Sequence, residues 1–190
     1  MPILNSINQM LGEMTEWRHD LHKIPEIGLE EYQTSKYIKN KLNEFKINFK
    51  DGYSNTGIVA WVDGNKVTTD KTIALRADFD ALPMPEKNEF NHKSNNEGMM
   101  HACGHDGHAT MLLGAAKYLS ENNIFDGRVY FIFQPGEEGF AGGKKMIDDG
   151  MFKDFKIDEV YALHNWPELP LGTFGVNSGP MMAAVDEFDI

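Results

Sequence analysis

The sequence predicts an α/β domain with a largely parallel or mixed sheet, because strand-like and helix-like segments alternate along its 190 residues. The strand-like run at 72–80 begins with continuous apolar residues, which is typical of a strand covered by helices on both faces. Acidic residues or a histidine stand where three of the predicted strands end. Because sites in such sheets gather at the carboxyl ends of the strands, the pattern also predicts one shared site.

Composition favours one soluble globular domain, with 41% hydrophobic and 25% charged residues. The net charge of −11 and the lack of a basic patch disfavour a nucleic-acid partner. No apolar run approaches the length that spans a bilayer, and the N-terminus lacks the features of a signal peptide. We therefore expect a cytoplasmic protein with no membrane partner. The single cysteine, Cys103, excludes an intrachain disulfide.

Apolar periodicity and turn residues place the elements. Helical spacing predicts helices over 3–22, about 30–45, 109–119 and 141–152, with Pro25 ending the first. The glycines within 141–152 weaken that helix. Apolar runs bounded by turn signals predict strands over 57–62, 72–80, 127–133, 159–164 and 172–177. A further strand is expected to begin at 47–49, and another at 184–190.

The stretch His101-Ala-Cys-Gly-His-Asp-Gly-His108 is the strongest candidate for chemistry. If it is extended, Cys103 and His105 point to the same side. A thiolate and an imidazole suit zinc, and also manganese, cobalt or nickel, so the pair predicts half of a metal site. Alternatively, Cys103 is a nucleophile activated by His105. That alternative ranks lower because it leaves the later acidic and histidine residues without roles.

The other half of the site is expected at Glu137, Glu138 and His164. Adjacent side chains diverge, so Glu138 can bind a cation while Glu137 faces a metal-bound water and moves its proton. His164 adds a nitrogen donor at the end of a strand. A thiolate can also bridge two cations, so a two-metal cluster is one reading of Cys103.

Four further residues are expected to support the site. Asp78 and Asp80 either orient ligand histidines or bind backbone amides at the end of their strand, and both readings stay open. His101 and His108 have supporting or structural roles in this interpretation.

Five stretches, in order along the chain, resemble the amidohydrolase branch of the peptidase M20 metallohydrolases. They are Trp17-Arg-His-Asp-Leu-His-Lys-Ile-Pro-Glu26, Leu75-Arg-Ala-Asp-Phe-Asp-Ala-Leu-Pro83, the 101–108 cluster, Phe133-Gln-Pro-Gly-Glu-Glu138 and Ala162-Leu-His-Asn-Trp-Pro167. The resemblance implies a three-layer αβα fold of the zinc-exopeptidase type.

The resemblance also implies the chemistry. Two divalent cations, of manganese, zinc, cobalt or nickel, would be bound by Cys103, His105, Glu138 and His164, with Cys103 bridging them. Glu137 would be the general base that activates a metal-bound water. The reaction would be hydrolysis of the amide bond in hippurate-like or N-acetyl amino acids.

Members of this family are much longer than this chain. The resemblance implies that residues 1–182 are the N-terminal part of the catalytic domain and that 183–190 begin a lid or dimerisation domain. The remaining part would supply one more histidine ligand and the surface of a homodimer. Two alternatives follow: an inactive remnant that binds metal or a partner chain, or an M20 dipeptidase or carboxypeptidase. Cys103 argues against the second, because those branches usually place a carboxylate at the bridging position.

Overall fold

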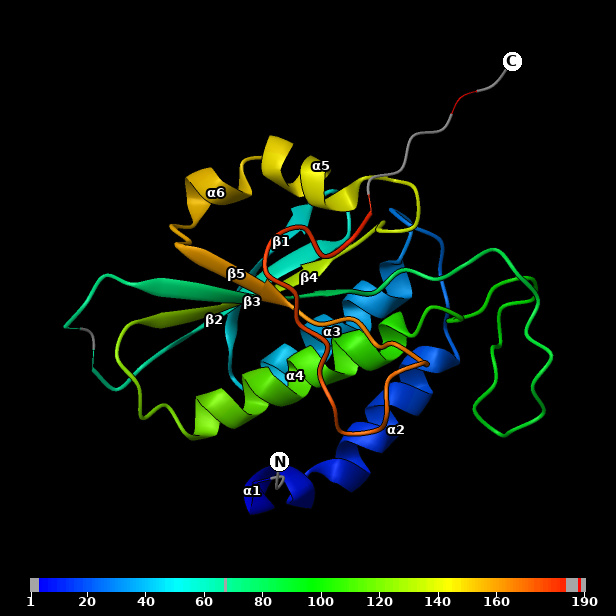
Figure 1. Cartoon of the computed structure of the whole chain (residues 1–190), viewed down its shortest axis with the longest axis horizontal. Coiled ribbons are helices and arrows are strands. Elements are labelled where there is room, and N and C mark those ends of the chain that lie inside the picture. The colour runs from blue at the N-terminus through cyan, green and yellow to red at the C-terminus, as the bar shows by residue number, and fades with distance from the viewer. Residues whose placement is uncertain (1–3, 67, 184–187, 189–190) are drawn as a thin grey trace.

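A five-stranded mixed sheet lies at the centre of the molecule, with helices on both faces (Figure 1). The computed structural model describes residues 4–66, 68–183 and 188. The strands are β1 (Asn48–Tyr53), β2 (Gly57–Asp63), β3 (Thr72–Asp78), β4 (Arg128–Gln134) and β5 (Glu159–Ala162), and their order across the sheet is β1-β2-β4-β3-β5. β2 pairs antiparallel with β1 and β4, whereas β3 pairs parallel with β4 and β5. The carboxyl ends of β3, β4 and β5 therefore lie at one edge.

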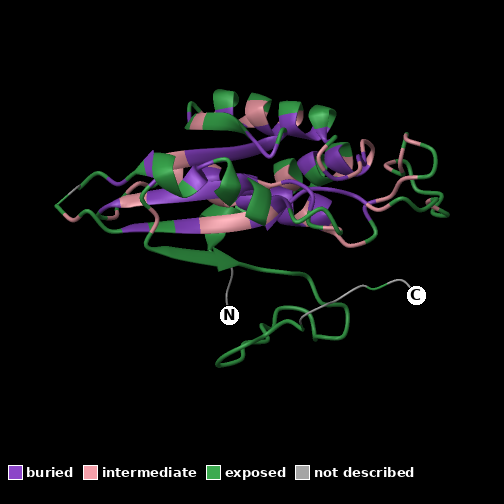
Figure 2. Cartoon of the chain, turned by 90° about the horizontal axis from the view of Figure 1, so that it is seen from above, coloured by how far each residue is buried: buried purple, intermediate pink, exposed green. Residues whose placement is uncertain are grey.

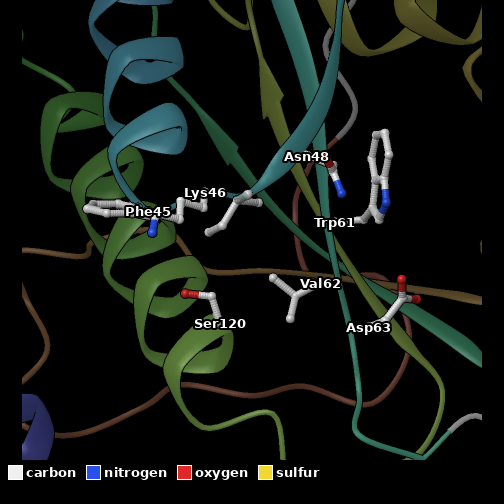
Figure 3. A pocket seen from close by; sticks show the side chains of 8 residues that line it. Phe45, Lys46, Asn48, Trp61, Val62, Asp63 and Ser120 are labelled. Atoms are coloured by element: carbon white, nitrogen blue, oxygen red, sulfur yellow. The ribbon is translucent and has the colours of Figure 1, made fainter.

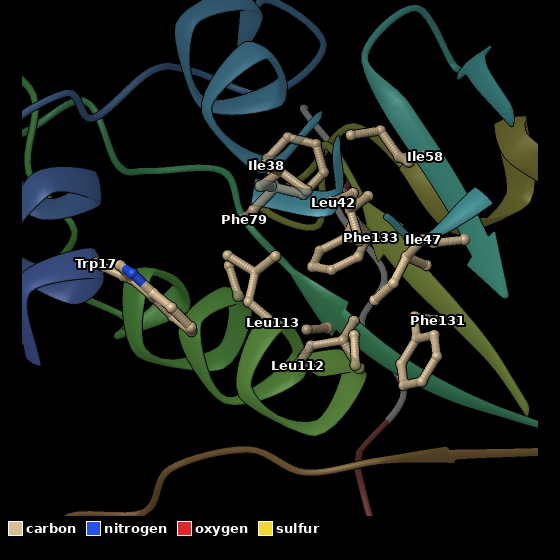
Figure 4. Close-up of a cluster of buried hydrophobic side chains, with 14 of the residues drawn as sticks. Trp17, Ile38, Leu42, Ile47, Ile58, Phe79, Leu112, Leu113, Phe131 and Phe133 are labelled. Carbon is tan, nitrogen blue, oxygen red and sulfur yellow. The ribbon is translucent and has the colours of Figure 1, made fainter. Parts of the chain in front are cut away.

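One face of the sheet is covered by α2 (Leu11–His22), α3 (Tyr32–Glu44) and α4 (His105–Glu121), and the short α1 (Asn5–Gln9) precedes them. Side chains alternate across a strand, so Ile58, Ala60 and Val62 of β2 join this core. Figure 4 shows Phe131 and Phe133 of β4 among the side chains of these helices. Burial of this apolar surface is the main force that holds the layer to the sheet.

The other face is covered by α5 (Gly142–Asp148) and α6 (Met151–Asp154). Val59 of β2 and Ile132 of β4 point to this side and pack against Met146 and Met151. The two cores confirm the predicted three-layer αβα arrangement. Figure 2 shows buried residues concentrated in the central strands and the inward helix faces, whereas β5 and the segment after it are exposed.

Three predicted helix boundaries are wrong. The helix expected over 3–22 is broken at Met10, whose N–H donates to the carbonyl of Ile7 three residues back, and residue 3 lies outside the described part. The helix expected over 141–152 divides because Gly150 adopts a left-handed φ of 94°. The helix expected over 109–119 begins four residues earlier, at His105.

The strand expected over 172–177 does not form. Instead, Thr173 donates from both its N–H and its hydroxyl to the carbonyl of Pro170, which closes a turn. Periodicity alone cannot supply the neighbouring strand that a ladder requires. The strand expected over 184–190 falls, except for Phe188, outside the described residues. Within the described part of the chain, no helix has the length and apolarity needed to cross a membrane.

Candidate active site

The candidate site lies at the edge where three parallel strands end. Asp78 ends β3, Glu137 and Glu138 follow β4 after a Pro-Gly turn, and His164 stands two residues after β5. A fourth segment, the loop before α4, carries Cys103. The structure thus brings residues that are far apart in sequence to one place, as we expected from their positions at the carboxyl ends of the predicted strands.

The segment between Cys103 and His105 is a left-handed turn, so the prediction of an extended segment is wrong. Gly104 has φ 89° and ψ 18°, and His105 is the first residue of α4. A Cβ at position 104 would lie 2.5 Å from Oδ1 of Asn165, so both the backbone and the packing require glycine. Even so, one ligand-type atom each of Cys103, His105 and His164 lies within 4.8 Å of the others.

His105 presents a free nitrogen to the centre of the site. Its Nδ1–H donates to the carbonyl oxygen of Asp80 at 2.9 Å and to the Asp80 carboxylate at 3.2 Å. Its Nε2 is buried and has no hydrogen-bond partner among the described residues. This nitrogen lies 3.9 Å from Oε1 of Glu138 and 4.0 Å from Oε2 of Glu137. A buried lone pair surrounded by carboxylates fits a bound cation.

Glu137 and Glu138 both approach His105, so the prediction that their side chains diverge is wrong. The reason is the turn that carries them, in which Gly136 and Gly139 have φ values of 59° and 82°. Glu138 is the less exposed of the two side chains, at 24% against 43% for Glu137. Burial, together with the charges of Glu138 and Asp78, raises the pKa of Glu137.

His164 offers its Nε2 toward the thiol. Its Nδ1–H donates to the carbonyl oxygen of Asn165 at 2.7 Å, so Nε2 carries the lone pair, and it lies 3.5 Å from Sγ of Cys103. Burial and then Glu138 raise the pKa of the Cys103 thiol to about 12. The site therefore holds an excess of acidic groups, and a cation would offset it.

His108 and Asp78 also lie near His105, but the polar atoms of their side chains already have hydrogen-bond partners. Nδ1–H of His108 donates to Asp78 at 2.6 Å, and its Nε2 accepts from the N–H of Asn165 at 3.0 Å. Arg76 donates to the other oxygen of Asp78 at 2.7 Å, a contact that sequence reasoning missed. Burial raises the pKa of Asp78, but the His108 hydrogen bond and the Arg76 charge lower it by more. Both residues support the segment that carries His164.

Asp80 does both things that the sequence left open: it orients a histidine, and it binds a backbone amide. One carboxylate oxygen accepts from His105, as described above, and the other accepts from the N–H of Glu138 at 2.8 Å. His101 is buried but belongs to none of the candidate ligand groups of the described residues. Neither of its ring nitrogens has a hydrogen-bond partner there, and burial lowers its pKa to about 4.

A second network, outside the ligand group, fixes the first turn of α4. Asp106 accepts from Nδ1–H of His22 at 2.8 Å and from Nε–H of Arg18 at 3.3 Å. The second nitrogen of His22 donates to Glu86 at 3.0 Å. Sequence reasoning gave no role to Glu86, which stands in a polar loop without a periodic pattern.

One cavity in the described part of the chain lies apart from the candidate site. It measures about 360 Å³ and lies where α3 meets β1, beside the ends of β2 and α4 (Figure 3). Its lining residues are Phe45, Lys46, Ile47, Asn48, Trp61, Val62, Asp63 and Ser120. The candidate site lies instead at the end of the parallel strands, where His105 is buried and Glu137 is partly exposed.

This chain is similar to known hydrolases in sequence and to a metal-binding peptidase in structure. Hippurate hydrolase of Campylobacter jejuni is 43% identical over the whole chain, which covers 49% of that protein. N-acetyl-L-cysteine deacetylase of Bacillus subtilis is 44% identical over 91% of the chain and is covered to 41%. The YXEP protein of Bacillus subtilis, a dinuclear metal binding peptidase of the M20 family, has a crystal structure that superposes with a TM-score of 0.85. It is 37% identical, over 91% of this chain and 48% of its own.

The chain spans about half the length of the relatives it matches, or somewhat less. The model of peptidase family M20/M25/M40 matches residues 74–188, which include all four predicted metal ligands and Glu137. This chain belongs to peptidase family M20/M25/M40.

Proposed function

We propose that the protein containing this chain hydrolyses the amide bond of N-acyl amino acids with the help of two divalent cations. The observation that carries the proposal is the buried, unpartnered Nε2 of His105, which faces the carboxylates of Glu137 and Glu138. The names of two relatives support the substrate class, because hippurate and N-acetyl-L-cysteine are both N-acylated amino acids.

Cys103, His105, Glu138 and His164 are the residues that would hold the cations. The chemistry of this donor set, which combines sulfur, nitrogen and oxygen, fits zinc, manganese, cobalt or nickel. The cations would supply positive charge that lowers the pKa of water and polarises the amide carbonyl. A dinuclear site in the YXEP protein supports two cations rather than one.

Glu137 is the proposed general base and acid. Its carboxylate accepts a proton from the attacking water, whose oxygen forms a bond to the amide carbon. It then donates that proton to the nitrogen of the breaking C–N bond, so the products are a carboxylate and a free amine. The raised pKa of Glu137 favours this cycle, because a carboxylate with a higher pKa is a stronger base.

Asp80 and His108 have positioning roles in this proposal. Asp80 fixes the tautomer of His105, since its two oxygens hold the imidazole N–H and the backbone of Glu138. His108 holds the backbone that follows His164. Neither residue needs to touch the substrate.

The test is turnover of hippurate, N-acetyl amino acids and dipeptides by the protein as its gene encodes it, loaded with Mn²⁺ or Zn²⁺. We expect Glu137→Gln to lower kcat by about 10²- to 10⁴-fold while the affinity for the cation stays the same. Glu121→Gln, at an exposed position at the end of α4, is the matched control and should retain full activity.

Each alternative has its own outcome in this experiment. Unchanged turnover by Glu137→Gln would remove Glu137 as the base. Hydrolysis of dipeptides alone would favour the dipeptidase or carboxypeptidase alternative. Bound metal without turnover of any substrate would favour the inactive remnant.

A further inference from the structure

Glu31 is a buried acid to which the chemistry described so far gives no role. It stands directly before α3, far from the candidate site in sequence, and its exposed fraction is 0%. Burial raises the pKa of its carboxyl. A fully buried carboxyl is costly unless hydrogen bonds compensate it, so its partners indicate why it is there.

The two oxygens of Glu31 have different partners. Oε1 accepts from the backbone N–H of Gly136 at 2.9 Å. Oε2 accepts from the hydroxyl of Thr56 at 2.5 Å. Thr56 stands directly before β2, so the side chain of Glu31 connects the start of β2 with the turn that follows β4.

That turn carries the proposed base and a proposed metal ligand. Gly136 has a left-handed φ of 59° and immediately precedes Glu137 and Glu138. The N–H of Glu138 is held by Asp80 at 2.8 Å, so a carboxylate binds the backbone on each side of Glu137. Glycine adopts a left-handed φ without steric cost, so hydrogen bonds from neighbouring groups, rather than the local backbone alone, hold this turn in place.

We propose that Glu31 is a positioning residue that holds the Gly136 turn so that Glu137 and Glu138 face His105. This inference rests on the proposed function only in naming Glu137 as the base and Glu138 as a ligand. The feature that matters is an acceptor for the Gly136 N–H, not the negative charge. The amide of glutamine could supply that acceptor through its oxygen and donate to the hydroxyl of Thr56 through its nitrogen.

Glu26 offers a matched control. It is also a buried acid of the same segment, with 9% exposure, and its carboxylate accepts from backbone amides. Its partners, however, are the N–H groups of Gln33 and Thr34 in the first turn of α3. Loss of the Glu26 carboxylate should therefore destabilise the fold without moving the Gly136 turn.

The experiment compares Glu31→Met, Glu31→Gln and Glu26→Met in the protein as its gene encodes it. The readouts are Mn²⁺ affinity by calorimetry, thermal stability, and kcat and KM for hippurate and N-acetyl amino acids. We expect Glu31→Met to lower both Mn²⁺ affinity and kcat by about 10- to 100-fold, with KM unchanged. Glu31→Gln should restore both, and Glu26→Met should lower thermal stability alone.

Equal Mn²⁺ affinity in Glu31→Met and the unaltered protein would overturn the inference, and so would an equal loss in Glu31→Met and Glu26→Met. If Glu31→Met does not fold, amide hydrogen exchange at Gly136 in the unaltered protein decides. Protection like that of the β4 amides supports the inference, and exchange as fast as an exposed loop overturns it. If the unaltered protein hydrolyses no substrate, the proposed function fails, but Mn²⁺ affinity still tests Glu31.

Discussion

Replacing Asp80 by asparagine tests the site most directly, because one side chain orients two of the proposed ligands. Asp80 is 1% exposed, and its carboxylate oxygens accept from Nδ1–H of His105 and from the N–H of Glu138. Asparagine has one acceptor oxygen, so its amide group would face one of these two donors. One hydrogen bond to a charged group is lost, which costs about 1.5 to 3 kcal/mol.

The structure indicates where this cost appears. His105 keeps its 2.9 Å hydrogen bond to the carbonyl oxygen of Asp80, so its ring keeps its orientation. The Glu138 turn can move in the absence of metal and bind water, but it must return when a cation binds. The lost energy therefore appears in metal affinity, which should fall by about 10- to 100-fold at 1.4 kcal/mol for each factor of ten.

The assay is calorimetric titration of the metal-free protein with Mn²⁺, together with thermal unfolding of the same sample. Asp158→Asn is the control, because its carboxylate accepts from the N–H of Thr72 at 2.9 Å at the opposite end of β3. That variant keeps the one acceptor oxygen that Thr72 needs, so it should keep its Mn²⁺ affinity and most of its thermal stability. Unchanged affinity in Asp80→Asn, or an equal loss in both variants, would refute the assigned role of Asp80.

Two other expectations concern the surroundings of the site. Gly104→Ala should lower the melting temperature more than Gly98→Ala, because both glycines have positive φ but only a Cβ at 104 would meet Asn165. An equal loss of melting temperature in the two variants would show that the contact with Asn165 does not matter. The hydrogen bond to Asp106 raises the pKa of His22 against the effect of burial. The stability that this hydrogen bond contributes should therefore be complete below pH 6.5 and should disappear as the pH rises through the higher folded-state pKa of His22. Urea unfolding of His22→Gln and the unaltered protein across this range measures the difference, about 1 to 3 kcal/mol at low pH; a difference independent of pH would contradict it.

The sequence by itself determined the elements whose signals are local. Continuous apolar runs identified β2, β3 and β4 to within two residues at each end, because burial on both faces leaves a pattern within each strand. The cluster at 101–108 and the polar residues after the strands also identified the site region. Local information sufficed there, since the carboxyl ends of parallel strands meet at one edge whatever their order.

Only the tertiary structure decided what depends on a partner far away in the chain. It placed β4 between β2 and β3, which no run of residues encodes, and it left 172–177 without a neighbouring strand. It also showed which nitrogen of His105 is free and brought Glu31 to the turn before Glu137. The physical reason is common to these cases: a hydrogen bond to a distant group depends on where the backbone of that group lies, and packing of the whole chain sets that position.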